Sequence, residues 1–267
     1  MRLTIHHRTH YTYENAPTHM VQLLRLTPRD EAHQRVIEWE ITAPGRQTLF
    51  RDAFQNITQT HVVQTPHASH DIEVNGVVEV QRLVEGELRE EETVPPIAYL
   101  CPTELTQGDA ALNALAPQAL NYGLTRPVDA LMLAGAICRV VDYQSGQTDA
   151  TSTAAQALAL GRGVCQDHAH VMIAACRSVG VPARYVSGYV DPGNSRAAAS
   201  HAWADVWLGN RWVSIDVTNG VFASDGHCRL AVGRDYLDAS PIRGIREGGR
   251  AEHLEVSVSI ATATVQQ

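Results

Sequence analysis

The stretch GRGVCQDHAHVMIAACRSV, residues 161–179, sets a single cysteine at the start of a mostly apolar segment of helical length. Two glycines precede Cys165, and Gly180 followed by Pro182 supplies a stop signal after the segment. We therefore expect a helix that begins near Cys165 and is buried on most sides. The positive end of the helix dipole would stabilise a thiolate there, which makes Cys165 the candidate nucleophile. The alternative is a core residue, because cysteine also behaves as a small hydrophobe.

A second stretch, SHAWADVWLGNRWVSIDVTNG at residues 200–220, has two alternating runs around a Gly-Asn pair, which indicates a β-hairpin. If the Gly-Asn pair is the loop, Leu208 pairs with Arg211, and His201 and Asp216 become diagonal neighbours on one face. Diagonal Cβ atoms lie roughly 7 Å apart, a distance that an imidazole and a carboxylate can bridge. An odd-length loop or a bulge would reverse the faces, so this prediction depends on the turn.

The residues of this hairpin separate by parity into two faces. The apolar face carries Ala202, Ala204, Val206, Leu208, Val213, Ile215 and Val217. The second face is aromatic and polar, we place the site on it, and it carries His201, Trp203, Asp205, Trp207, Trp212, Ser214, Asp216 and Thr218. Its three tryptophans would either line a dry approach to the nucleophile or pack beneath the nucleophile helix.

Cys165, His201 and Asp216 together supply a nucleophile, a base and an acid that orients the base, which is the logic of a catalytic triad in its cysteine form. Each also has a structural explanation, since a histidine at a strand start is usually a surface residue and an aspartate there can open a turn. The combination favours catalysis. The backbone N–H of Cys165 is the expected first oxyanion donor, and the second donor stays unassigned.

Several motifs around these residues, in this order, resemble those of bacterial transglutaminase-like proteins, a family with proposed cysteine proteases. They are GVCQDHAH (163–170), GVPARYVSGYV (180–190), SHAW (200–203), WVSID (212–216) and AVGRDYLD (231–238). The opening segment, with LLRLTPR at 23–29, resembles the β domain that accompanies the core in this family. The resemblance implies a triad of Cys165, His201 and Asp216. The chain departs from the family pattern at His168, where an aromatic residue is common, and at Val217, where a proline is common.

Composition indicates a soluble globular protein, because 44% of the 267 residues are hydrophobic and 19% are charged. A formal net charge of −8 argues against a nucleic-acid surface. No apolar run has the length of a membrane span, and the first residues lack the apolar core of a signal peptide, so we expect a cytoplasmic protein without membrane association. An odd number of irregularly spaced cysteines fits a reducing compartment: Cys101, Cys138, Cys165, Cys176 and Cys228.

The alternating pattern before residue 84 predicts an antiparallel β-sandwich, with strands at 3–13, 19–26, 35–42, 47–53, 57–64 and 71–81. We divide the chain into an N-terminal β domain (1–84), an acidic, solvated linker (85–104) and a catalytic domain (105–267). In the last part we expect helices at 109–115, 127–142 and 151–160 besides the nucleophile helix, and strands at 184–189 and 253–265. The fold class is α+β, a β-sandwich followed by a papain-like, transglutaminase-like core.

The sequence gives no reason to expect a cofactor or a metal. Cys165, His168 and His170 have the wrong helical spacing to meet at one ion, and the glycines before them lack the remaining pattern of a phosphate-binding loop. Arg234 is expected to pair with Asp235, Asp238 or a nearby carboxylate and to stay outside the site.

The expected reaction is acyl transfer at an amide through a thioester. Water as the acceptor would make the protein a peptidase or amidase, which we favour, and an amine would make it a protein-glutamine transglutaminase. A non-catalytic binding module that keeps the fold is the third alternative. The expected partner is a peptide or protein substrate, with an amine as the co-substrate in the second case, and the oligomeric state is left open.

Overall fold

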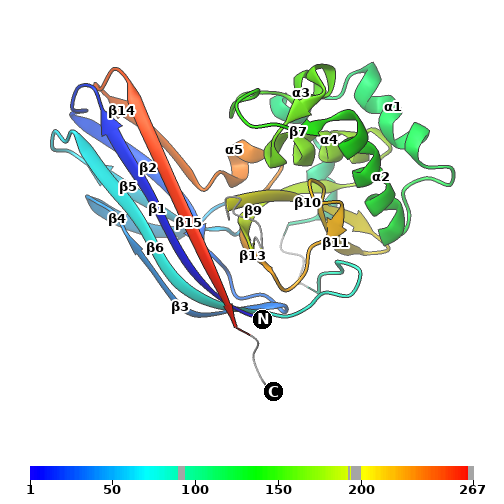
Figure 1. The fold of residues 1–267 in the computed structure, drawn as a ribbon, viewed down its shortest axis with the longest axis horizontal. Helices are drawn as coiled ribbons and strands as arrows, with labels where there is room; N and C mark the ends of the chain where they lie inside the picture. The colour runs from blue at the N-terminus through cyan, green and yellow to red at the C-terminus, as the bar shows by residue number, and fades with distance from the viewer. Residues whose placement is uncertain (90–93, 192, 194–199, 264–267) are drawn as a thin grey trace.

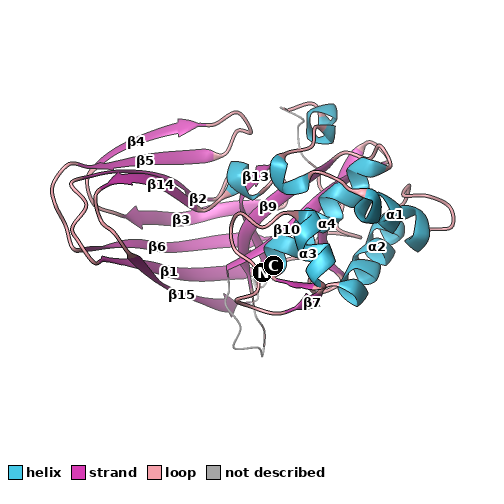
Figure 2. Cartoon of the chain, turned by 90° about the horizontal axis from the view of Figure 1, so that it is seen from above, coloured by secondary structure: helices cyan, strands magenta, loops and turns pink. Residues whose placement is uncertain are grey.

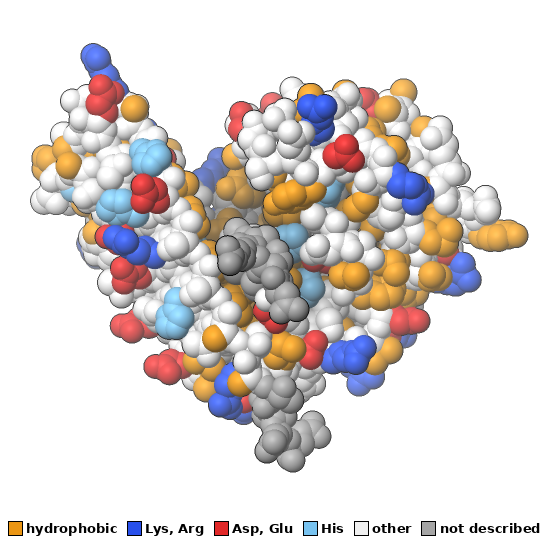
Figure 3. All heavy atoms as spheres, in the orientation of Figure 1, with side chains coloured by type: hydrophobic (Ala, Val, Ile, Leu, Met, Phe, Trp, Pro, Cys, Tyr) orange, Lys and Arg blue, Asp and Glu red, His pale blue; other side chains and the backbone are white. Residues whose placement is uncertain are grey.

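The computed structural model describes residues 1–89, 94–191, 193 and 200–263 of the chain. They form two lobes, a β-sandwich and a smaller sheet covered by helices (Figure 1). The surface is hollowed between the lobes at the top of the view in Figure 3. This agrees with the predicted α+β fold class.

The sandwich consists of two four-stranded antiparallel sheets, ordered β15-β1-β6-β3 and β14-β2-β5-β4 (Figure 2). Alternate residues of β1, β2 and β6 point inward and form its core, as the period-2 pattern predicts. The six predicted strands are confirmed as β1 (Arg2–Tyr13), β2 (His19–Thr27), β3 (Gln34–Thr42), β4 (Arg46–Arg51), β5 (Ile57–Val63) and β6 (Ser69–Val80).

The last two strands of the sandwich come from the C-terminal part of the chain. Strand β14 (Ile242–Glu247) pairs with β2, and β15 (Glu252–Ala263) pairs along the whole of β1. The expectation that residues 105–267 form one catalytic domain is therefore wrong for these two strands. Alternation in a sequence identifies a strand but not its partner, which lies more than two hundred residues away in this case.

The second lobe is built on a five-stranded antiparallel sheet, ordered β12-β11-β10-β9-β13. Helices α1 to α4 lie on one side of it (Figure 1). Its strands are β9 (Ala183–Val190), β10 (Ser200–Leu208), β11 (Arg211–Asp216), β12 (Val221–Phe222) and β13 (His227–Gly233). The helices are α1 (Ala110–Ala119), α2 (Pro127–Val140), α3 (Ala154–Leu160), α4 (Cys165–Ser178) and α5 (Tyr236–Ala239), and a short parallel pair joins β7 (Asp142–Tyr143) to β8 (Arg162–Gly163).

The predicted hairpin is confirmed as β10 and β11, with Leu208 paired to Arg211. Gly209 and Asn210 form its loop with φ angles of 56° and 63°, and two left-handed residues of this kind match the right-handed twist of the strands. Because the loop has two residues, the predicted separation of the faces also holds. Helix α4 packs on the apolar face with Ala202, Ala204 and Val206 among its neighbours in the core.

The segment predicted as a solvated linker packs against the other face of the hairpin. The N–H of Leu88 donates to the carbonyl of Trp212 at 2.9 Å, and Leu88 and Tyr99 form a buried cluster with that tryptophan. The prediction of a solvated linker is therefore wrong for Leu88 and Tyr99. It was based on the acidic composition of the segment, which does not reveal that these two apolar residues are buried. The acidic residues 90–92 themselves lie outside the described residues.

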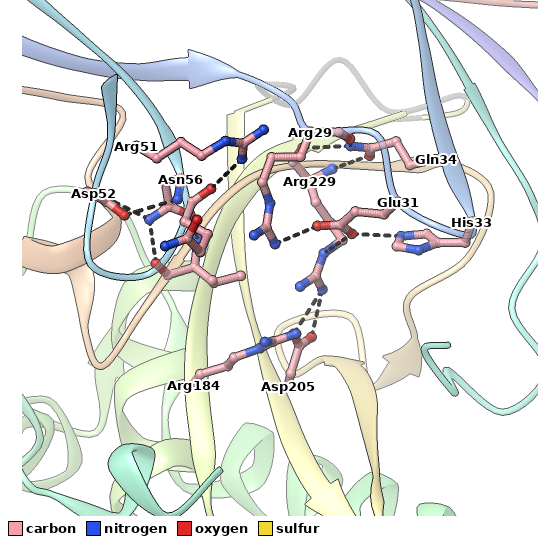
Figure 4. A network of polar contacts seen from close by, with 12 residues as sticks. Arg29, Glu31, His33, Gln34, Arg51, Asp52, Asn56, Arg184, Asp205 and Arg229 are labelled. Atoms are coloured by element: carbon pink, nitrogen blue, oxygen red, sulfur yellow. Dashed lines mark hydrogen bonds and ion pairs between the residues drawn. The ribbon is translucent and has the colours of Figure 1, made fainter. Parts of the chain in front are cut away.

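Charged residues join the two lobes in a buried network (Figure 4). Asp205 on β10 accepts from Arg184 at 2.9 Å and from Arg229 at 2.9 Å, and Arg229 reaches Glu31 of the sandwich lobe at 3.1 Å. Burial alone would raise the pKa of Asp205, but the two guanidinium groups lower it. Asn56, another residue of the sandwich lobe, bonds both the N–H and the carbonyl of Val232 on β13. The lobes are thus locked together at the sheet that carries the candidate site.

Candidate active site

Cys165 is the first residue of α4, as the sequence predicts. Asp167 caps this helix end by accepting from the N–H of Val164 at 2.7 Å and from the hydroxyl of Thr148 at 2.7 Å. Gly163 is required beside it, since a Cβ at this position would lie 2.6 Å from the Cβ of Asp167. The N–H groups of the first helical turn have no intrahelical acceptor, so the N–H of Cys165 can donate to a negative oxygen.

The structure brings His201, at the start of β10, to Asp216, at the end of β11. His201 Nε2 lies 2.9 Å from Asp216 Oδ1, a close ion-pair contact between two largely buried side chains. The Cys165 thiol is close enough to this imidazole to raise the pKa of His201. The three predicted site residues therefore meet, and they come from one helix and two strands.

The site favours a charged imidazole. Burial disfavours the imidazolium, but the hydrogen bonds to Asp216 and Cys165 outweigh burial and raise the pKa of His201 to about 10. Burial would likewise raise the pKa of Asp216, whereas the hydrogen bonds from His201 and His227 hold it well below its usual range. At neutral pH the arrangement keeps a proton on His201 and a negative charge on Asp216.

Asp216 is fully buried and has three further donors that the sequence analysis missed. The side chain of Asn219 donates to Oδ2 at 2.7 Å, its backbone N–H donates to Oδ1 at 3.2 Å, and His227 Nε2 lies 3.1 Å from Oδ2. The spacing Asp-Val-Thr-Asn is a turn signal that would have pointed to Asn219. His227 carries no comparable signal, because it approaches from β13, which is not next to β11 in the sheet.

The two histidines that follow Cys165 in the sequence have other partners. His168 donates from Nε2 to the carbonyl of Val141 at 2.9 Å, and its Nδ1 lies 3.0 Å from the hydroxyl of Thr218. His170 Nε2 accepts from the backbone N–H of Tyr236 at 3.1 Å. His168 thus ties α4 to the residue two places after Asp216. Among the described residues no three candidate ligands converge on one point.

The tryptophans of the hairpin do not line the site, nor do they pack beneath α4. Trp203 and Trp212 are fully buried and belong to two clusters on the opposite face of the sheet from α4, and the half-buried Trp207 packs against Trp212 with ring centroids 5.2 Å apart. Both alternatives offered for them are therefore wrong. The ring of Trp203 instead packs against two histidine rings, with its centroid 6.3 Å from that of His201 and 5.3 Å from that of His227. A hairpin has two faces, and parity alone does not say which of them a helix will cover.

Comparisons with known proteins agree with this architecture. Residues 3–79 match the bacterial transglutaminase-like N-terminal region, and residues 122–217 match the transglutaminase-like superfamily. An uncharacterised protein of Mycobacterium leprae is 33% identical, over 97% of this chain and 98% of its own. An uncharacterised protein of Mycobacterium tuberculosis is 32% identical, over 91% of this chain and 87% of its own.

A crystal structure named as a "putative cysteine protease" from Cytophaga hutchinsonii superposes with a TM-score of 0.79 at 22% identity, over 100% of this chain and 92% of that one. At this identity the likeness concerns the fold. The chain belongs to the bacterial transglutaminase-like family, with a transglutaminase-like core and the N-terminal domain of that family. No helix among the described residues is long and apolar enough to cross a bilayer.

Proposed function

We propose that the protein is a cysteine-dependent enzyme that transfers the acyl group of a peptide or amide bond to water. Cys165 is the nucleophile, His201 is the acid and base, and Asp216 orients and charges the imidazole. The observation that carries this proposal is the 2.9 Å contact of His201 with the carboxylate of Asp216, at an imidazole whose pKa is also raised by Cys165, the first residue of α4.

The charges of the site suggest the order of the steps. In the proposed first step the proton of the Cys165 thiol passes to His201, whose pKa is raised to about 10, and a thiolate is left beside an imidazolium. The thiolate attacks the amide carbonyl, and the N–H of Cys165 donates to the developing oxyanion. The C–N bond then breaks, His201 gives its proton to the leaving amine, and a thioester forms. Water, deprotonated by the neutral His201, releases the acid and restores the thiolate and the imidazolium.

Two alternatives stand beside hydrolysis. An amine in place of water would give a protein-glutamine transglutaminase, and the packing of the three tryptophans into clusters on the face opposite α4 removes the reason for a dry, amine-favouring approach along the hairpin. A non-catalytic binding module would have no need for a carboxylate buried against two histidines and an asparagine beside a cysteine. The substrate is proposed to be a peptide or protein and the location cytoplasmic.

The acceptor is tested with a library of peptides, some containing glutamine, together with a labelled primary amine. Products are followed by mass spectrometry in the native protein and in Cys165→Ala, which removes the nucleophile and changes little of the packing. We expect hydrolysed peptides from the native protein alone. Amine-tagged products in excess of hydrolysed ones would establish the transglutaminase, and equal turnover by both proteins would leave the binding module.

A further inference from the structure

His227 is a second histidine on the carboxylate of Asp216, and it lies on the opposite side from His201. It is the first residue of β13, is only 8% exposed, and its Nε2 lies 3.1 Å from Asp216 Oδ2. His201 instead approaches Oδ1 at 2.9 Å. The two oxygens of one carboxylate are thus divided between two histidines.

The hydrogen bonds of His227 define which nitrogen carries its proton. The backbone N–H of Ser224 donates to Nδ1 at 3.2 Å, so Nδ1 must present its lone pair. The proton then sits on Nε2 and is donated to Asp216. Since Ser224 lies three residues before His227 in a tight turn, this tautomer is fixed by the backbone and does not depend on a mobile side chain.

The ring of His227 is also held in place by packing. It makes a T-shaped contact with Trp203, and the centroids of the two rings are 5.3 Å apart. Trp203 Nε1 in turn donates to the hydroxyl of Ser214 on the neighbouring strand at 2.9 Å. A leucine could fill this space against the tryptophan. It could not accept from Ser224 and donate to Asp216 at the same time, which is the property that the site uses.

We propose that His227 is a positioning residue that, with Asn219, fixes Oδ2 of Asp216 and thereby aims Oδ1 at His201. This inference rests on the proposed triad, because positioning matters only if His201 and Cys165 react. His227 itself touches neither the nucleophile nor the substrate carbonyl in this scheme. Without its N–H, Oδ2 keeps the side-chain donor of Asn219, and the carboxylate can rotate away from the imidazole, so that His201 activates Cys165 less well.

The experiment measures the rate of alkylation of Cys165 by iodoacetamide between pH 5 and 9, which needs no knowledge of the substrate. It compares the native protein with His227→Leu, His227→Gln and His70→Leu. Gln keeps a donor near the position of Nε2 and an acceptor for Ser224. His70 is a matched control, because it is equally buried at 8% exposure but lies on β6 in the sandwich. Thermal melts identify any variant that fails to fold.

We expect His227→Leu to alkylate about fivefold more slowly at pH 6, with the pH profile displaced upward, while His227→Gln and His70→Leu stay within about twofold of the native rate. Folded His227→Leu with a native or faster rate would overturn the positioning role, and so would folded His227→Gln with a rate as low as that of His227→Leu. If native Cys165 reacts no faster than Cys138, the triad itself fails and this inference falls with it.

Discussion

Two aspartates on the same hairpin and the same face, Asp205 and Asp216, are both fully buried but serve different ends. Asp205 lies between Arg184 and Arg229, whose guanidinium groups keep their protons at any ordinary pH. Asp216 lies between His201 and His227, which are side chains able to lose or gain a proton. A buried aspartate with arginine partners, Asp205, therefore holds the two lobes together, whereas a buried aspartate with histidine partners, Asp216, is a candidate catalytic group.

The largest contrast between the two aspartates is expected in turnover. Asp216→Asn keeps the shape but removes the charge that stabilises the imidazolium, so we expect kcat to fall by about 10³- to 10⁴-fold with the fold intact. The measurement is peptide or amide hydrolysis on any substrate that the library identifies. Asp205→Asn is the matched control on the same strand pair. Equal losses in both folded variants would contradict a special role for Asp216.

Stability should show the reverse order. Asp205→Ala leaves Arg184 facing no carboxylate on β10, and removal of one partner from a buried ion pair typically costs about 3–5 kcal/mol. Chemical denaturation should therefore give a much lower free energy of unfolding for this variant. Asp71→Ala, which breaks the exposed pair with Arg8 on the sandwich, should change stability little. A similar small change in both variants would remove Asp205 from its structural role.

The pH dependence of stability separates the two partner types. The pKa of His201 is raised from 6.5 to about 10, so its stabilising contribution is fully present below pH 6.5 and is lost as the pH rises through 10. The arginines around Asp205 contribute no such slope there. We expect the melting temperature of the native protein to fall more steeply between pH 7 and 10 than that of His201→Gln. Parallel curves would mean that His201 is not held as a cation.

The sequence was sufficient for the first six strands and for the hairpin that carries His201 and Asp216, because both depend on local patterns. Strands β1 to β6 lie within two residues of their predicted ends, and the turn chemistry of Gly209-Asn210 fixes the register that unites His201 with Asp216. The sequence could not identify contacts between residues that are far apart in the chain. The pairing of β15 with β1 and the approach of His227 from β13 depend on contacts that no spacing encodes.

The central claim is that Cys165 is the reactive thiol of the five. Cys176 and Cys228 are buried, and burial raises the pKa of both thiols, that of Cys176 to about 12. Burial likewise raises the pKa of Cys138, whose sulfur donates to the carbonyl of Val217 at 2.9 Å.

The most direct test is brief treatment of the native protein with iodoacetamide at pH 6, with the modified cysteines mapped by mass spectrometry. Cys165 should be labelled first, and His201→Gln should abolish this preference by removing the imidazolium that stabilises the thiolate. Labelling of Cys101, Cys138 or Cys176 ahead of Cys165 in the native protein would contradict the account.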